Sequence, residues 1–297
     1  RVETAVGQII SLPASGETFL NVPILRSGRL PDPDAHDEVA VNEPFAIANG
    51  YRAGDRFFAN INGTRRELTI TGTLLSPEFI YALGPGALMP DKEGFAVIWM
   101  PERAVQAAFD MTGAFNSLTV GLYAGTNEAE VIDRLDATLE RYGTTGAYGR
   151  DRQISDSFVS SELDQLWTMT VVLPPIFFGV AAFLVNMVLG RIVALERSEI
   201  GLLKALGYSN TAIAMHYQML AGLTAVVGIL VGWAFGAWLA HGLATLYAKF
   251  FNFPYLIFRG SWSVYAISGL IGLVSAAFGA LRVALRAARL PPAVAMQ

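Results

Sequence analysis

The sequence predicts an α+β extracytoplasmic domain followed by an all-α transmembrane domain of three helical spans. Charge is divided unevenly: residues 1–165 contain 13 Lys and Arg and 23 Asp and Glu, whereas residues 166–297 contain 8 and 2. Only 15% of all residues are charged, against about 25% in typical soluble domains. Long uncharged stretches occupy the second part, and strand and helix patterns alternate in the first. We therefore predict two domains, residues 1–165 and residues 166–297, that fold in different surroundings.

Three stretches of the second domain are long enough to cross a bilayer. Residues 169–190, 217–248 and 261–281 contain no formally charged side chain. A hydrocarbon core of about 30 Å requires roughly 20 helical residues, and a helix satisfies its own backbone there. Buried helices of a soluble core would be shorter, with charges on one face. The predicted spans lie at about residues 169–190, 217–246 and 262–281.

Basic residues predict the orientation of these spans. Six Lys or Arg residues lie in the 191–216 connection and the C-terminal tail together, and two lie in the 249–260 connection. Positively charged connections stay on the cytoplasmic side. The prediction is therefore a multi-pass protein with residues 1–165 outside the cytoplasm.

Small residues recur at every fourth position in the second and third spans. In lipid, where no hydrophobic force drives helices together, such residues permit close approach of two backbones. Asn186 is a polar residue inside the first span, and we expect it to form an interhelical hydrogen bond. The predicted helix-packing residues are Gly228, Gly232, Gly236, Gly272 and Ala276.

Residues 1–165 show the patterns of a mixed α+β domain. Residues 55–61 and 64–75 are rich in β-forming residues and flank Asn62-Gly63, a strong type I′ hairpin signal. The loop at 83–93 is too irregular to pair. The other predicted elements are strands at 95–100 and 117–123 and helices at 102–110 and 127–142.

Composition excludes several classes of function. The chain has no cysteine and only three histidines, far apart, so thiolate sites and local histidine zinc motifs are absent from the sequence. An acidic first domain argues against a nucleic-acid partner. No phosphate-binding loop of the type G-x-x-x-x-G-K-[ST] occurs. We predict a non-catalytic chain without metal or cofactor, whose first domain is a binding or lever element.

One acidic cluster could be imagined as a metal site. Asp32, Asp34, Asp37 and Glu38 surround His36. The cluster contains two prolines and has no regular ligand spacing, which favours a solvated surface turn.

The most informative segment lies between the first two spans. Residues 196–206 combine apolar positions with good helix formers, include the only two acidic residues of the second domain and stop at Gly207, a typical helix-ending residue. Ser209 can cap the following helix. The segment predicts a short amphipathic helix, for which the sequence pattern leaves an interfacial helix on lipid headgroups open.

Residues 197–207, R-S-E-I-G-L-L-K-A-L-G, resemble the R-x-E-I-G-x-[LM]-[KR]-A-[LI]-G stretch of the FtsX-like permeases of ABC transporters, the family that includes MacB-like and lipoprotein-release permeases. Residues 76–100 are similar to the extracytoplasmic core domain of its long, two-module members. The end of the chain also fits the pattern of the family, at Ala287, Pro291, Pro292, Ala295 and Met296.

The resemblance implies a span before the outer domain, so we expect the chain to be part of a longer polypeptide whose core domain is truncated at its start. It also implies a bacterial cytoplasmic (inner) membrane location and three partners: an ABC ATPase subunit on the cytoplasmic side, a second permease module or subunit, and membrane lipid. The ATPase-coupling residues carried over from the family are Glu196, Arg197, Glu199, Ile200, Gly201, Leu203, Lys204, Ala205 and Leu206.

The leading hypothesis is a permease subunit that transmits an ATPase-driven conformational change to the outer domain, with ATP hydrolysis in the partner. The spans contain no charged side chain to line a polar path, which favours export or extraction of a lipophilic or lipid-anchored substrate. The alternative is a non-transporting regulator that relays the ATPase state to an external protein such as a cell-wall hydrolase. A third hypothesis, an inward-signalling receptor, would need a larger cytoplasmic domain.

Overall fold

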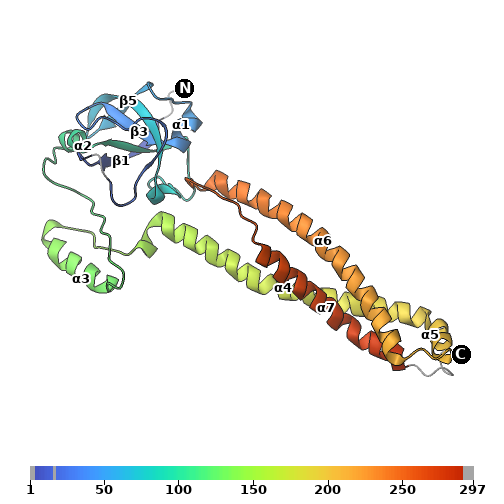
Figure 1. Ribbon diagram of the computed structural model, residues 1–297. Coiled ribbons are helices and arrows are strands. Elements are labelled where there is room, and N and C mark those ends of the chain that lie inside the picture. Colours follow the sequence, from blue (N-terminus) through green and yellow to red (C-terminus); the bar gives the residue numbers. More distant parts are fainter. Residues whose placement is uncertain (1–3, 16–17, 290–297) are drawn as a thin grey trace. The chain divides into compact units, whose positions relative to one another are not determined.

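The computed structural model describes residues 4–15 and 18–289 (Figure 1). The chain divides into two compact units. The first comprises Arg1–Glu162 with Leu246–Leu256, and the second comprises Leu163–Thr245 with Ile257–Gln297. An α+β sheet domain is thus followed by long apolar helices, as the sequence predicts.

The first unit is built on a mixed six-stranded sheet. The order is β1-β6-β3-β5-β2, with β4 paired to one end of the long strand β5. The pairs β1–β6 and β3–β5 are parallel, and the other pairs are antiparallel. The strands are β1 (Val6–Leu12), β2 (Ile24–Gly28), β3 (Glu38–Asn42), β4 (Arg56–Ile61), β5 (Thr64–Leu75) and β6 (Phe95–Pro101).

The predicted hairpin is confirmed. β4 and β5 pair antiparallel, with Ile61 opposite Thr64 across the Asn62-Gly63 turn. Both turn residues have positive φ, 49° and 76°. A type I′ turn requires positive φ at its two central residues, which Asn and Gly tolerate best.

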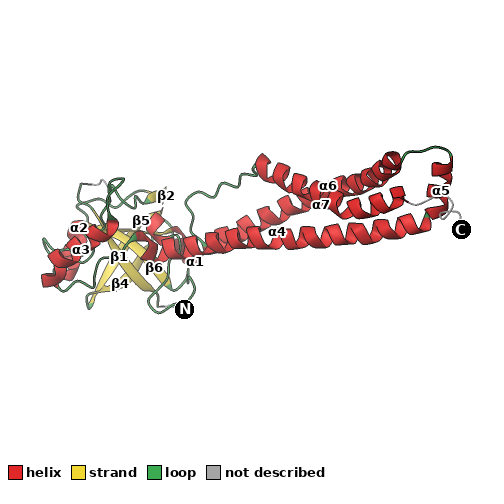
Figure 2. Ribbon diagram, turned by 90° about the horizontal axis from the view of Figure 1, so that it is seen from below, coloured by secondary structure: helices red, strands yellow, loops and turns green. Residues whose placement is uncertain are grey.

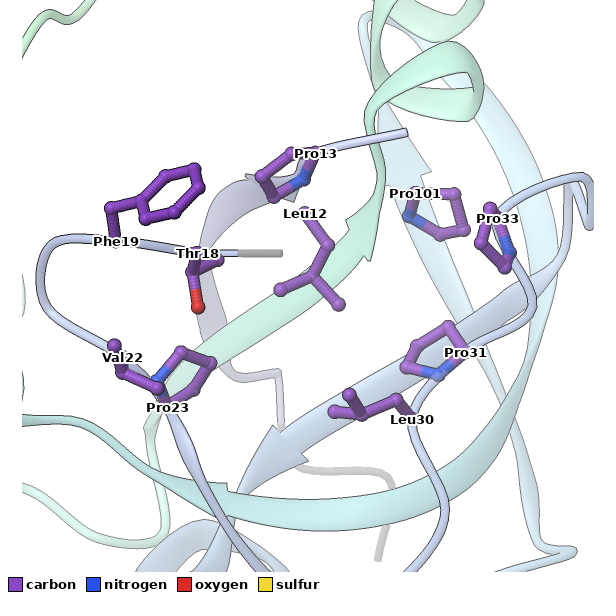
Figure 3. A pocket seen from close by; sticks show the side chains of 10 residues that line it. All are labelled: Leu12, Pro13, Thr18, Phe19, Val22, Pro23, Leu30, Pro31, Pro33 and Pro101. Carbon is purple, nitrogen blue, oxygen red and sulfur yellow. The ribbon is translucent and has the colours of Figure 1, made fainter. Parts of the chain in front are cut away.

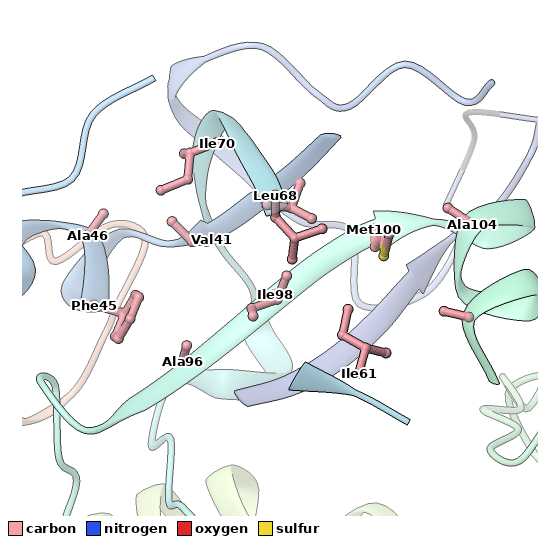
Figure 4. Close-up of a cluster of buried hydrophobic side chains, with 12 residues drawn as sticks. Val41, Phe45, Ala46, Ile61, Leu68, Ile70, Ala96, Ile98, Met100 and Ala104 are labelled. Carbon is pink, nitrogen blue, oxygen red and sulfur yellow. The ribbon is translucent and has the colours of Figure 1, made fainter. Parts of the chain in front are cut away.

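β6 lies inside the sheet and is buried along its whole length. Its side chains alternate between the two faces. Ala96, Ile98 and Met100 belong to one apolar cluster (Figure 4), and Val97 and Trp99 to a second one. A continuous apolar run is what a strand covered on both faces requires.

Helices α1 (Glu43–Asn49) and α2 (Glu102–Phe109) contribute buried residues to the first cluster, including Phe45 and Ala104. The helix expected at 127–142 is α3 (Glu128–Leu139) followed by a 3₁₀ turn, η2 (Glu140–Tyr142). Two further 3₁₀ turns are η1 (Pro77–Phe79) and η3 (Arg150–Arg152).

The prediction of a strand at residues 117–123 is wrong. This segment lies outside any strand, and its alternating residues Leu118, Val120 and Leu122 are exposed. Alternation predicts a half-buried strand only where a neighbouring strand pairs with it, and none does so among the described residues. Strands β1, β2 and β3 and helix α1 were not predicted.

Three helices are long and apolar enough to cross a membrane, which confirms the predicted number of candidate spans among the described residues. They are α4 (Ile154–Leu195), α6 (Asn210–Phe250) and α7 (Trp262–Arg289), and the short helix α5 (Arg197–Ala205) follows α4. α4 includes Pro174 and Pro175. Each long helix extends beyond its predicted span, because hydropathy marks only the apolar part of a helix. Within the second unit the three helices run side by side (Figure 2).

Candidate functional site

α5 is a separate short helix between two long ones. Its N-cap residue, Glu196, leaves helical geometry at φ −93° and ψ 16°. Gly207 follows with φ 95°, a conformation that favours glycine and ends the helix. The Ser209 hydroxyl then accepts a hydrogen bond from the Ala212 N–H at 3.1 Å, so Ser209 caps α6 as predicted.

One face of α5 is buried against the helices of its own unit. Ile200 is 1% exposed and the neighbouring Gly201 is also buried. Ile200 belongs to an apolar cluster with members from all four helices. This cluster packs α5 against the end of α4, the start of α6 and the end of α7. The other buried members are Leu189, Val193, Ile213, Tyr217, Ala221, Ala280, Val283, Ala284 and Ala287.

Two polar contacts reinforce this packing. The Tyr217 hydroxyl donates to the Glu196 carboxylate at 2.8 Å, which connects α6 to the start of α5. The Lys204 ammonium donates to the Ala288 carbonyl at 2.7 Å, near the C-terminus of α7. A cation near the C-terminus of a helix is electrostatically favourable. α5 is therefore attached directly to both α6 and α7 (Figure 1).

The opposite side of the segment is open. We call Glu199, Leu202, Leu203 and Leu206 the exposed α5 face; Arg197 is also exposed, but it lies four positions before Gly201 and seven before Lys204, on the other side of the helix. Positions 199, 202, 203 and 206 are three or four residues apart, so they lie along one side. Leu202 and Leu206 are 56% and 69% exposed. Such a patch of leucines beside an acidic side chain is suited to protein contact.

The structure divides the nine predicted coupling residues into three groups. Ile200 and Gly201 face inward, and Glu196 and Lys204 are half-buried with hydrogen bonds inside the unit. The remaining five are exposed: Arg197, Glu199, Leu203, Ala205 and Leu206.

Sequence reasoning omitted Leu202. The family pattern leaves this position open, so the resemblance gave no reason to select it. Helical spacing was the available signal, because residue 202 lies three positions after Glu199 and four before Leu206.

The predicted helix-packing residues fall into two groups, those with close neighbours on another helix and those without. Ala276 is buried, and a Cβ added at Gly272 would meet Ile229 at 3.2 Å. A Cβ added at Gly228, Gly232 or Gly236 would have no neighbour from another helix within 4 Å among the described residues. Packing by those three glycines stays a prediction.

A close approach between α4 and α7 involves an unpredicted residue. A Cβ added at Gly279 of α7 would overlap the backbone of Ala182 in α4, lying 2.9 Å from its Cα. The sequence signal was present, because Ser275 and Gly279 are four apart, one position out of phase with the stripe that was chosen.

Polar side chains join the same two helices. Asn186 donates to the Gly279 carbonyl at 2.9 Å, which confirms the expected interhelical hydrogen bond. Ser275 donates to the Phe178 carbonyl at 2.7 Å. Donors and acceptors inside a bilayer must find partners within the protein.

The acidic turn of the first unit pairs with arginines and backbone amides. Arg103 contacts Asp34 at 2.7 Å, and Arg29 donates to Glu38 at 2.7 Å. The Glu38 carboxylate also accepts from the Asp32 N–H, and its pairing with Arg29 lowers the pKa of Glu38. No cluster of His, Asp and Glu suited to a metal ion occurs among the described residues.

An apolar pocket of about 390 Å³ lies beside this turn (Figure 3). None of its lining side chains is ionisable, so it offers no acid–base chemistry. Half of the lining residues are proline: the set is Leu12, Pro13, Thr18, Phe19, Val22, Pro23, Leu30, Pro31, Pro33 and Pro101.

Comparison with known families decides what the helical unit is. The FtsX-like permease C-terminal domain matches residues 171–292. The chain carries an FtsX-like permease domain. The match includes α5, most of α4 and the pattern at the end of the chain only as far as Pro292, and residues 290–297 lie outside the described residues. None of the curated proteins matches the chain.

The FtsX-like domain and the three long apolar helices support a multi-pass membrane protein that is a permease-type component of an ABC transporter. The family implies an ABC ATPase partner in general. The matched segment begins after the first domain, so the MacB-like character of residues 1–165 stays a prediction.

Proposed function

We propose that this chain transmits ATP-driven motion from a cytoplasmic ABC ATPase to its first domain on the outer side of the inner membrane. The observation that carries the proposal is the exposed α5 face on a helix that is fixed to the long helices by Ile200, Glu196 and Lys204. A push on that face is transferred to α4, α6 and α7 because their ends share one buried cluster.

The chemistry belongs to the partner in this proposal. Phosphoryl transfer needs a phosphate cradle and Mg²⁺ ligands, and the sequence contains no phosphate-binding loop. A second permease module would complete the membrane assembly. The absence of charged side chains from residues 169–190 and 261–281 favours a lipophilic or lipid-anchored substrate that is exported or extracted.

The test uses the full polypeptide, purified with its ATPase and reconstituted in lipid vesicles. We expect Glu199→Ala combined with Leu203→Ala to reduce stimulated ATP hydrolysis at least fivefold or to release the ATPase, because both side chains lie on the exposed α5 face. A matched control is Glu93→Ala combined with Leu88→Ala, two exposed residues of the first unit. Unchanged ATPase binding and hydrolysis in the α5 variant would contradict the proposal.

The same preparation separates transport from regulation. A permease that moves a substrate is stimulated by adding that substrate class, for which a diacylated lipopeptide is the probe. Stimulation only by an external protein such as a cell-wall hydrolase would instead support the regulatory role.

A further inference from the structure

One loop of the first unit contacts the sheet and the outer ends of two long helices. Residues 77–82, which we call the joint loop, follow directly after β5 and Ser76 and begin with the 3₁₀ turn η1. The same unit contains the start of α4, up to Glu162, and the segment 246–256 that ends α6. All contacts described below lie within this unit.

The joint loop is anchored to the sheet by apolar contacts. The rings of Phe79 and Trp99 meet edge to face, with centroids 6.1 Å apart. Ala82 is buried in the same cluster as Val97 and Leu74. Because the loop continues from β5, which pairs with β2, β3 and β4, a displacement of the loop acts directly on a strand with three neighbours.

Ser155 attaches the loop to α4. Ser155 is only 2% exposed. Its hydroxyl lies 2.7 Å from the Glu78 carbonyl oxygen and 3.2 Å from the Tyr81 carbonyl oxygen. The same oxygen accepts a hydrogen bond from the Tyr81 N–H at 3.1 Å. The Gln153 amide donates to the Glu78 carbonyl at 2.8 Å. A buried hydroxyl with these partners is costly to detach, because separation would leave polar groups unsatisfied.

Tyr81 attaches the loop to both helices. Its ring stacks on Phe158 of α4 with centroids 4.3 Å apart, and it contacts Phe251, just after α6, at 5.4 Å. The Asn252 N–H donates to the Ile80 carbonyl at 2.7 Å, so the segment after α6 is also held by the backbone of the loop.

The two helices are connected to each other beside the loop. The Tyr247 hydroxyl of α6 donates to the Glu162 carboxylate of α4 at 2.9 Å. Sheet, α4 and α6 therefore meet through one short segment, in which Phe79 and Ala82 contact the sheet and Tyr81 contacts the helices.

We infer that the joint loop is the point through which motions of the first two spans enter the outer sheet, with Ser155 and Tyr81 as the positioning residues that hold it to the helices. The inference rests on the proposed function, since it names where the transmitted motion is delivered. Buried hydrogen bonds and ring stacking resist a change of geometry, so the loop follows the helices instead of sliding over them.

The experiment measures that motion. The 297 residues contain no cysteine, so Glu67→Cys in the exposed part of β5 and Met169→Cys in α4 allow selective nitroxide labelling before the ATPase is added. The distance between the two labels is measured by pulsed electron resonance in the full complex in nanodiscs, without nucleotide and with ATP and vanadate.

We expect a nucleotide-dependent shift of the distance distribution in the otherwise unchanged protein. Ser155→Ala combined with Tyr81→Ala should reduce this shift by more than half while ATP hydrolysis continues. The matched control is Ser160→Ala combined with Tyr123→Ala, an exposed serine of α4 and an exposed tyrosine of the outer domain, and it should leave the shift unchanged.

The outcomes separate the two proposals. No shift in the unchanged protein would overturn the proposed function. A full shift in the Ser155→Ala, Tyr81→Ala variant would overturn the joint alone. If that variant does not fold, the milder single variants Ser155→Ala and Tyr81→Leu decide: a reduced shift in either supports the joint, and a full shift in both overturns it.

Discussion

The sheet of the first unit and helix α7 of the second bury different kinds of side chain. Around the sheet the fully buried residues are large, among them Leu68, Ile70 and Met100. In α7 the buried residues are mostly glycine and alanine, such as Gly279 and Ala280. Large apolar side chains of α4 and α6, including Phe177 and Val231, are exposed instead.

The difference follows from the solvent of each unit. In water, burial of apolar surface stabilises a fold by about 25 cal/mol per Å², so large side chains lie inside. In lipid that driving force between helices is absent, and small residues permit the close contacts that hold helices together. Exposure of an isoleucine or a phenylalanine thus has a different cost in each unit, and three pairs of substitutions test this comparison.

The largest effect is expected in the sheet core. Ile70→Ala removes a side chain that is fully buried, and such a truncation costs about 2–5 kcal/mol. The matched substitution is Ile176→Ala in α4, where the isoleucine is 57% exposed and leaves no cavity. Chemical unfolding of the full chain in detergent, followed by tryptophan fluorescence, should show a large loss of free energy of unfolding for the first variant. Equal losses in both variants would break the comparison.

A smaller loss of stability is expected in the helices, where adding a side-chain atom destabilises the protein instead of removing one. Gly279→Ala adds one methyl group where the Ala182 backbone already lies, and overpacking of this kind costs about 1–3 kcal/mol. Gly232→Ala adds the same group in open space and removes a poor helix former, so it should be neutral or stabilising. Thermal unfolding in detergent compares them. A Gly279→Ala protein as stable as the Gly232→Ala protein would show that close approach of α4 and α7 is not needed.

The smallest effect on stability is expected from carboxylates, which occur in the first unit and are absent from the predicted spans. Burial raises the pKa of Glu78 above 4.5, whereas hydrogen bonding to Arg29 lowers the pKa of Glu38 below it. The stability associated with Glu78 is present below pH 4.5 and is lost as the pH rises through its raised pKa. That associated with Glu38 is present above pH 4.5 and is lost as the pH falls through its lowered pKa.

Glu78→Gln should therefore raise the unfolding midpoint at pH 7, and Glu38→Gln should lower it. Both differences should shrink on acidification, when the native carboxylates are protonated. Midpoints of thermal unfolding measured from pH 3 to pH 7 check the two signs. A loss of stability in Glu78→Gln at pH 7 would mean that the hydrogen bond from the Asn21 amide to the Glu78 carboxylate outweighs the cost of burying its charge.

Local signals predicted part of the fold well. The hairpin at Asn62-Gly63 follows from the positive φ that its turn requires, and the three long helices follow from uncharged length. β1 was not predicted, because its parallel partner β6 lies almost ninety residues later in the chain. Residues 117–123 show the converse error, since alternation gives a strand only where another strand accepts it.

The helix of the candidate site was predicted, but the side that it buries was not. The family pattern selected residues 196–206, yet it treated Ile200 and Glu199 alike. The structure separates them, because Ile200 enters a cluster of four helices while Glu199 stays in solvent. A helix has two sides, and only its neighbours decide which one is covered.

The sequence by itself determined the division into an acidic aqueous domain and an apolar helical one, because charge and hydropathy act residue by residue. It also determined where α5 lies and that a permease pattern runs through it. The tertiary structure alone decided that Ser155 and Tyr81 meet the joint loop and that Gly279 sets the spacing of α4 and α7. Such contacts join residues 70 to 100 positions apart, and their energies exist only once the chain has brought those residues together.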